Sequence, residues 1–238
     1  PLRKVLPFFP GRKPVVVTIH DVIPLLFPDK YPVGKKGRLA FLYQKYLLRF
    51  VSHIITDSQA SAQDIHSYLH VPKEKISAIY LASAQEATQL SKSEIDEVLT
   101  RYGITHPYIL YVGDINYNKN IPNLITSLTY LPKDIHLVLV GRNFREQDIP
   151  EWKAIGEAQE ILPESDTKRV HFLNDVSQDK KNDLAGLYQG ATVYVQPSLS
   201  EGFGLPVLEA MQFKTPVVVT KAGSLPEVVG KHGIVTNT

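Results

Sequence analysis

Residues 197–211 read Pro197-Ser-Leu-Ser-Glu-Gly-Phe-Gly-Leu-Pro-Val-Leu-Glu-Ala-Met211. They follow an apolar segment, Val193–Gln196, that is typical of a buried strand. Two glycines, Gly202 and Gly204, precede a helical pattern that begins near Leu205–Pro206, where proline suits the first turn. This order of strand, glycine loop and helix directs backbone N–H groups and the positive end of a helix dipole at one point. We therefore predict a phosphate site at this loop.

Two carboxylates flank the predicted phosphate site: Glu201 precedes the glycines and Glu209 lies one helical turn inside the helix. A carboxylate repels phosphate, but it accepts hydrogen bonds well from sugar and ribose hydroxyls. The pair therefore indicates a sugar nucleotide, whereas a glycine pair alone most often only turns a strand into a helix. Other phosphate motifs fit worse, because the chain has no G-x-x-x-x-G-K-[ST] and no D-x-D, and Val207 replaces the third small residue of a dinucleotide fingerprint.

Short β-branched runs alternate with amphipathic stretches along the chain, and several runs are apolar throughout, as in strands buried on both faces of a parallel sheet. The alternation predicts a doubly wound α/β architecture with right-handed crossovers. We expect strands at Val15–Ile19, His53–Thr56, Ile76–Tyr80, Tyr108–Val112, His136–Val140, Val170–Leu173, Thr192–Val195 and Pro216–Thr220.

A domain boundary is expected near residues 82–106. Residues 82–90 are small and polar, a helix-like stretch follows at Ser91–Tyr102, and a new strand starts after Pro107. We therefore divide the chain into residues 1–103, one α/β domain with its linker, and residues 104–238, a second domain.

Composition excludes several classes of protein. The 238 residues carry a net charge of +2, so nucleic acid is not an expected partner. There is no cysteine, which excludes disulfides and thiolate metal sites and favours a reducing compartment, the cytoplasm. No apolar run reaches the roughly 18 residues that span a bilayer. The first residue is proline, and we expect the chain to be a fragment.

Five segments together resemble one family. Glu201-Gly-Phe-Gly-Leu-Pro-Val-Leu-Glu209 resembles the E-x7-E motif of the retaining GT-B glycosyltransferases of family 4. Tyr111–Asn120 resembles the family's phosphate-binding strand and loop, and His171–Asn174 falls where the family contacts the nucleobase. Ser224–Gly230 resembles its S-x-P-E-V segment, and Thr18–Asp21 resembles the end of a strand that carries a sugar-contacting histidine. The resemblance covers nearly the whole chain.

The resemblance implies a GT-B fold, with two Rossmann-like parallel-sheet lobes and a cleft between them. The N-terminal, acceptor-side lobe is then incomplete, and the C-terminal, donor-binding lobe lacks its terminal helix. The implied reaction moves a sugar from a nucleoside diphosphate sugar to an acceptor hydroxyl with retention of configuration. No metal or other cofactor is expected, and the acceptor is a saccharide or a lipid-linked molecule in polysaccharide assembly.

Roles of single residues also follow from the resemblance. Glu201 would contact the donor sugar, Lys119 would neutralise the leaving phosphate, and His20 would face the donor sugar from the other lobe. Glu209 would bind the ribose hydroxyls. The remaining contacts, to the diphosphate and the nucleobase, are expected from Gly202, Phe203, Gly204, Leu205, Gly113, Phe172 and Leu173.

The chain departs from the family pattern at one place. The family often pairs its lysine with an arginine, and the two corresponding positions are Asp114 and Asn118. A bidentate phosphate clamp is thereby lost. Arg142 is a candidate substitute.

Two other functions stay open: a sugar-nucleotide epimerase of the same architecture, and a non-catalytic sugar-nucleotide-binding or scaffold module. Lys35-Lys36-Gly-Arg38 is expected to be a solvated helix start, with contact to the inner face of an anionic membrane as the alternative. Tyr43, Tyr46 and Phe50 are expected to lie in the core or an interface.

Overall fold

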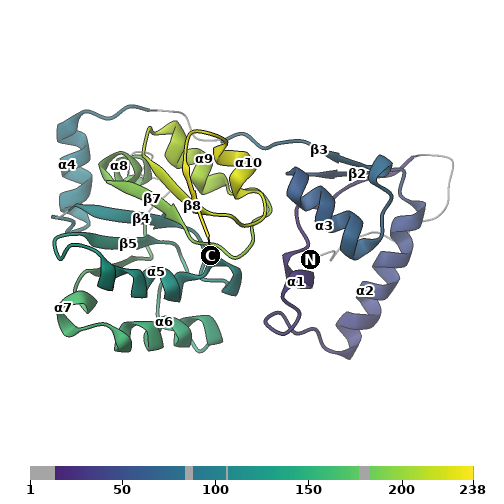
Figure 1. The fold of residues 1–238 in the computed structure, drawn as a ribbon, viewed down its shortest axis with the longest axis horizontal. Coiled ribbons are helices and arrows are strands. Elements are labelled where there is room, and N and C mark those ends of the chain that lie inside the picture. Colours follow the sequence, from purple (N-terminus) through teal and green to yellow (C-terminus); the bar gives the residue numbers. More distant parts are fainter. Residues whose placement is uncertain (1–13, 84–87, 106, 177–182, 238) are drawn as a thin grey trace. The chain divides into compact units, whose positions relative to one another are not determined.

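The computed structural model describes residues 14–83, 88–105, 107–176 and 183–237. The chain forms two compact units (Figure 1). One consists of Pro1–Leu81 with Ser200–Phe203, and the other of Ala82–Leu199 with Gly204–Thr238.

The first unit is built on a three-stranded parallel sheet of order β1-β2-β3, with β1 at Val16–Thr18, β2 at His53–Thr56 and β3 at Ile76–Ala78. Val17 lies opposite Ile54, and Ile55 lies opposite Ser77. The α-helices are α1 (Ile23–Leu26), α2 (Lys35–Leu47) and α3 (Gln59–Leu69), and short 3-10 turns occupy Leu48–Phe50 and Lys73–Lys75.

Apolar residues of the sheet and of these helices form the core of the first unit. Ile54 and Ile65 are fully buried at its centre. Helix α3 begins at a side-chain cap, since the Ser58 hydroxyl accepts a hydrogen bond from the Ser61 N–H at 3.0 Å. The helix ends where His70 adopts a left-handed conformation (φ 59°).

The second unit is built on a six-stranded parallel sheet of order β6-β5-β4-β7-β8-β9. Its strands are β4 (Tyr108–Val112), β5 (His136–Val140), β6 (Val170–Leu173), β7 (Val193–Gln196), β8 (Val217–Thr220) and β9 (Ile234–Thr236). The chain adds strands on one side of β4 and then returns to add the rest on the other side. The order therefore reverses between β4 and β7, which is the Rossmann arrangement.

Helices cover both faces of this sheet, and each face has its own core (Figure 1). One core takes in α4 (Lys92–Arg101), α8 (Asp183–Gly190), α9 (Leu205–Gln212) and α10 (Leu225–Val229). The other takes in α5 (Ile121–Ser127) and α6 (Pro150–Ile161), and α7 (Glu164–Thr167) follows α6. Neighbouring strand residues alternate between the two cores: Leu110 belongs to the first and Ile109 to the second.

Helix α4 packs on α8 and so groups with the second unit, whereas the division at residue 103 placed it with the first. The buried Asp183 carboxylate accepts hydrogen bonds from Tyr102, at 2.6 Å, and from Arg101. Close packing reinforces this contact, because a Cβ on Gly186 would lie 2.9 Å from Val98.

Among the helices of the described residues, none combines the length and the apolar character that crossing a bilayer requires.

Candidate functional site

Loops after β4 and β7 meet at the point where the strand order of the second unit reverses. Two hydrogen bonds join them: the Leu199 N–H donates to the Asn118 carbonyl at 2.7 Å, and the Asn120 side-chain amide donates to the Pro197 carbonyl at 3.0 Å. Ligands of open α/β sheets bind outside the carboxyl ends of the strands at this place. The predicted phosphate loop and the predicted lysine loop therefore form one continuous edge.

Glycines directly after β4 and β5 let the backbones of the two loops approach each other closely. A Cβ on Gly141 would lie 2.0 Å from the carbonyl oxygen of Gly113, and a Cβ on Gly113 would lie 2.7 Å from the hydroxyl of Tyr111. The Gly113 N–H donates to the Val140 carbonyl at 2.9 Å. The chain then makes a 3-10 turn that ends at Lys119, which is half-buried.

The loop after β7 leads directly into α9. Gly204 is the N-cap residue and has a positive φ of 100°, a conformation that glycine adopts without steric cost. Its carbonyl accepts from Val207 and Leu208, and no side chain caps the helix. With Pro206 in the first turn, the N-terminus of α9 has the features that sequence analysis predicted for a phosphate site.

Glu209 lies on α9 and is half-buried. Its Oε2 atom accepts a hydrogen bond from the hydroxyl of Tyr188 at 2.9 Å. Burial raises the pKa of Glu209 above the ordinary 4.5, and the Tyr188 hydrogen bond acts in the opposite direction. The carboxylate predicted to bind ribose is thus held by a tyrosine that sequence analysis did not single out.

A series of buried, hydrogen-bonded polar side chains supports the loop after β7. The Tyr194 hydroxyl contacts the Gln196 side-chain oxygen, and the Gln196 amide donates to the Ser198 hydroxyl at 2.9 Å. The Thr220 hydroxyl donates to the carbonyl of Ser198. These side chains are buried, so the loop leaves β7 on a satisfied hydrogen-bond network.

Four residues of this loop, Ser200–Phe203, belong to the first unit. Of them, Glu201 is 7% exposed and Phe203 is 8% exposed. The roles of Glu201, Gly202 and Phe203 at a donor sugar stay predictions.

The two positions predicted to meet the nucleobase lie on opposite faces of β6. The ring of Phe172 packs against Phe144 and Trp152, with centroids 5.7 and 5.6 Å apart, on the α6 face. Leu173 packs on the other core, and its carbonyl accepts from the Gly141 N–H at 3.0 Å. The Phe172 ring is thus engaged in an aromatic cluster, and its contact with a base stays a prediction.

Acidic and amide side chains occupy the positions where the family often has arginine. The Asp114 carboxylate accepts from the Asn143 amide at 3.0 Å, and the Asp114 carbonyl accepts from the Tyr111 hydroxyl at 2.8 Å. Asn118 is buried. Arg142, the candidate substitute, is exposed and lies two residues after the strand β5, at the carboxyl edge of the sheet.

In the first unit, His20 follows β1 and pairs with Asp57, which follows the neighbouring strand β2. His20 Nδ1 lies 2.7 Å from Asp57 Oδ2. The histidine side chain is 69% exposed, whereas that of Asp57 is 9% exposed. A buried carboxylate on Nδ1 fixes the ring and leaves Nε2 on the outer side. Sequence analysis missed Asp57, although adjacent parallel strands bring their carboxyl ends together.

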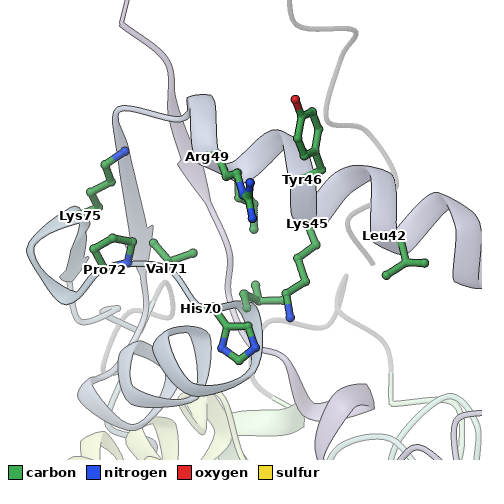
Figure 2. Close-up of a pocket in the computed structure, with 10 residues that line it drawn as sticks. Leu42, Lys45, Tyr46, Arg49, His70, Val71, Pro72 and Lys75 are labelled. Carbon is green, nitrogen blue, oxygen red and sulfur yellow. The ribbon is translucent and has the colours of Figure 1, made fainter.

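A cavity of about 450 Å³ lies in the first unit between α2 and the loop after α3 (Figure 2). Its basic side chains serve the fold: the Lys45 ammonium donates to the Tyr68 carbonyl at 2.8 Å, and Lys75 donates to the Val51 carbonyl at 3.2 Å. Arg49 lies over the ring of Tyr46. These basic side chains are therefore engaged within the first unit, and we do not assign the cavity as the candidate site.

The outer face of α2 corrects one expectation. Tyr43 and Tyr46 of α2, and Phe50 of the 3-10 turn that follows it, were expected in the core or in an interface, and they are 57%, 52% and 46% exposed. The helical periodicity was interpreted correctly, since α2 begins at Lys35 and buries Leu47. A core position for these three side chains is thus wrong within the described part of the chain, whereas the expectation of an interface stays a prediction.

Comparison with known proteins gives the context of these two units. Residues 106–238 match the family model for glycosyl transferases group 1, and residues 3–82 match that for glycosyltransferase family 4. The chain is 33% identical over 232 residues to the O-antigen chain mannosyltransferase B of Escherichia coli, covering 93% of this chain and 57% of the relative. It is 33% identical over 193 residues to the MMP alpha-(1->4)-mannosyltransferase of Mycolicibacterium hassiacum, covering 80% of this chain and 42% of the relative.

A solved structure extends the comparison to the fold. The crystal structure of Alr3699/HepE from Anabaena, in complex with UDP-glucose, matches with a TM-score of 0.75 and 25% identity, covering 95% of this chain and 59% of that one. The chain thus spans little more than half the length of that protein and of the Escherichia coli relative. The two parallel-sheet units have the α/β architecture of GT-B glycosyltransferases, with a short N-terminal lobe. Because a family model matches more than half of the chain, the chain belongs to the glycosyl transferases group 1 family.

Proposed function

We propose that the protein transfers a sugar from a nucleoside diphosphate sugar to an acceptor hydroxyl, with retention of anomeric configuration. One observation carries the proposal: at the reversal point of the second sheet, β7 passes through Gly204 into an uncapped helix that bears Glu209 one turn further on. This arrangement offers an anion site beside an acceptor for hydroxyl groups. Both are needed to bind a sugar nucleotide.

The proposed mechanism depends on electrostatics. Lys119 and the N–H groups at the start of α9 stabilise the diphosphate as it leaves, while the sugar passes through an oxocarbenium-like state. Glu201 binds hydroxyls of the donor sugar and is not a nucleophile. The acceptor attacks from the face that the diphosphate leaves, and the diphosphate takes the acceptor proton.

His20 contributes from the first unit. With Asp57 on Nδ1, a neutral ring carries its proton there and presents Nε2 as an acceptor for a hydroxyl of the donor sugar. No metal ion is required in this scheme, because lysine and a helix terminus supply the positive charge.

Mannose is the proposed sugar. Two relatives that are 33% identical are named as mannosyltransferases, whereas the 25% identical structure holds UDP-glucose. A hydroxyl of a growing polysaccharide or of a lipid-linked saccharide is the proposed acceptor, as the name of the Escherichia coli relative suggests.

Isothermal titration tests the donor site directly. The chain is titrated with GDP-mannose, UDP-glucose and ADP-glucose, and we expect micromolar binding of one donor. Glu209→Ala should abolish that binding, while Glu160→Ala, an equivalent change at the exposed end of α6, should not. Absence of binding to every donor would refute the proposed function for this chain.

Retention is tested by turnover. The bound donor is incubated with the chain and an oligosaccharide acceptor, and the anomeric configuration of the product is determined by proton NMR. A product of inverted configuration would refute the retaining mechanism. Interconversion of donors without acceptor would support an epimerase, and binding without turnover would support a binding module.

We also propose that α2 contacts an anionic membrane surface. Its exposed apolar side chains lie beside exposed basic ones, a combination that suits a membrane interface. The residues concerned are Leu39, Leu42, Tyr43, Tyr46, Lys35, Lys36 and Arg38.

Vesicle sedimentation tests this contact. The chain should pellet with phosphatidylglycerol vesicles and not with phosphatidylcholine vesicles. Changing Lys35, Lys36 and Arg38 together to Gln should abolish pelleting. Equal pelleting of this variant would refute the proposal.

A further inference from the structure

Tyr188 and Glu209 form a hydrogen-bonded pair between two helices on one face of the second sheet. Tyr188 lies on α8, and its hydroxyl is 2.9 Å from Glu209 Oε2 on α9. Tyr188 is fully buried, whereas Glu209 is half-buried. The pair therefore joins a phenol in the core to a carboxylate that is partly accessible to solvent.

The position of the Tyr188 hydroxyl is fixed by the packing around it. Its ring stacks on Phe213, with centroids 5.5 Å apart and planes at 20°, and contacts Tyr194 at 5.8 Å. The Thr215 hydroxyl donates to the Tyr188 carbonyl at 2.7 Å, which holds the end of α8. A side chain held on this many sides places its hydroxyl within a narrow range.

The direction of the hydrogen bond is also fixed. Burial raises the pKa of Tyr188 well above its ordinary 10, so the phenol is protonated at neutral pH. It therefore donates to the ionised Glu209 carboxylate, which accepts. A carboxylate has about four acceptor positions, so one hydrogen bond from Tyr188 leaves capacity for hydroxyl donors.

Packing alone does not require a hydroxyl at this position. Phenylalanine would fill the same space, whereas a phenol in the core costs free energy unless it finds a partner. The partner is a carboxylate that the proposed function uses. The hydroxyl thus serves the side chain that it contacts.

We propose that Tyr188 is a positioning residue that orients the carboxylate of Glu209 toward the two ribose hydroxyls of the nucleotide. The inference rests on the proposed function, because it takes Glu209 as the group that binds ribose. It adds a residue outside the E-x7-E segment and a reason for its hydroxyl. Without Tyr188, the carboxylate rotates about its side-chain bonds and loses affinity for a diol.

The first test is a cycle between a substitution and a change in the ligand. Wild type and Tyr188→Phe are titrated with UDP, GDP and ADP, and the diphosphate that binds wild type is compared with its 2′,3′-dideoxyribose analogue. Tyr188→Phe should weaken binding of the ribose form about tenfold, the loss expected for about one hydrogen bond to a charged group. It should leave binding of the dideoxy form unchanged.

Tyr108→Phe is the matched control. Tyr108 is equally buried, and its hydroxyl donates to the Leu187 carbonyl at 2.7 Å, in the same unit but not to Glu209. This variant should lose stability without losing affinity for either ligand. An equal loss for both ligands in Tyr188→Phe, or no loss for either, would overturn the inference. If wild type binds none of the three diphosphates, the proposed function itself fails.

The pH dependence of binding gives a second readout that a purely structural role would not change. Removing the Tyr188 hydroxyl takes away the contact that lowers the pKa of Glu209, so this pKa rises further. The pH at which binding is lost on acidification should therefore move upward in Tyr188→Phe and stay unchanged in Tyr108→Phe. An unchanged acid limb in Tyr188→Phe would contradict a positioning role.

Replacement of Tyr188 by 3-fluorotyrosine covers the case in which phenylalanine prevents folding. The fluorinated phenol fits nearly the same volume and is a stronger donor, so the acid limb should move to lower pH. A limb that stays in place would overturn the inference.

Discussion

Gly204→Ala is expected to destabilise the second unit and to disrupt its loop. Gly204 has a φ of 100°, and a Cβ there would lie 2.9 Å from Cδ2 of Leu225, which is fully buried on α10. The backbone conformation costs a non-glycine residue about 1–2 kcal/mol. Displacing a packed leucine costs about 1–3 kcal/mol more. We therefore expect the free energy of unfolding to fall by about 2–5 kcal/mol.

Gly103→Ala is the matched control. Gly103 also has a positive φ, 67°, but a Cβ there would meet nothing within 4 Å. This variant should lose only the same backbone cost, about 1–2 kcal/mol. Binding of the donor should be unaffected, because Gly103 follows α4 and lies outside the candidate site.

Urea unfolding followed by tryptophan fluorescence measures both variants. The chain has a single tryptophan, Trp152, on α6, so the signal reports on the second unit. Donor affinity is measured by isothermal titration in the absence of urea. Equal unfolding free energies for the two variants, together with wild-type donor affinity in Gly204→Ala, would refute the reasoning from the loop geometry.

Three further predictions concern charged groups. Burial raises the pKa of Glu209, so the contribution of this group to stability should fall as pH rises above 4.5. In urea unfolding, the free energy of unfolding of Glu209→Gln should exceed that of wild type at pH 7, and the two values should converge below pH 4.5. Arg169→Met removes hydrogen bonds to three backbone carbonyls and should cost on the order of 3 kcal/mol in the same assay, more than Lys133→Met, whose ammonium is exposed. Asp57→Asn should lower kcat in a turnover assay while KM changes less, because it removes the carboxylate that holds the ring of His20. An unchanged kcat would exclude that role.

Several strands of both sheets were predictable from the sequence. The structure has β2, β4, β5 and β6 within the bounds that their apolar, β-branched runs predicted. The strand β9 was not predicted, since it has only three residues, all of them exposed, at the edge of the sheet. Such a strand is formed by pairing with β8 rather than by a periodic pattern of its own.

Local motifs were predictable, whereas partners from distant elements were not. The order of strand, glycine loop and helix around Gly204 can be inferred because it depends on neighbouring residues. Tyr188 lies 21 residues before Glu209, and its sequence context is that of an ordinary apolar helix face. Which polar group meets a buried tyrosine depends on how two helices pack, and this information is not contained in either segment. The exposed face of α2 has the same cause, because periodicity defines a face but not its neighbour.

The proposed function assigns phosphate binding and ribose binding to different groups, which the two kinds of substitution can distinguish. The proposed phosphate part consists of backbone at Gly204 and the start of α9, so it should respond to conformational strain and not to protonation. The proposed ribose part is the side chain of Glu209 with Tyr188, so it should respond to pH and to loss of a hydroxyl while the backbone stays in place. Gly204→Ala should therefore weaken nucleoside diphosphates more than nucleosides, and Tyr188→Phe should weaken both by the same factor. A nucleoside whose affinity falls in Gly204→Ala as much as that of its diphosphate would mean that the loop and the carboxylate act as one unit.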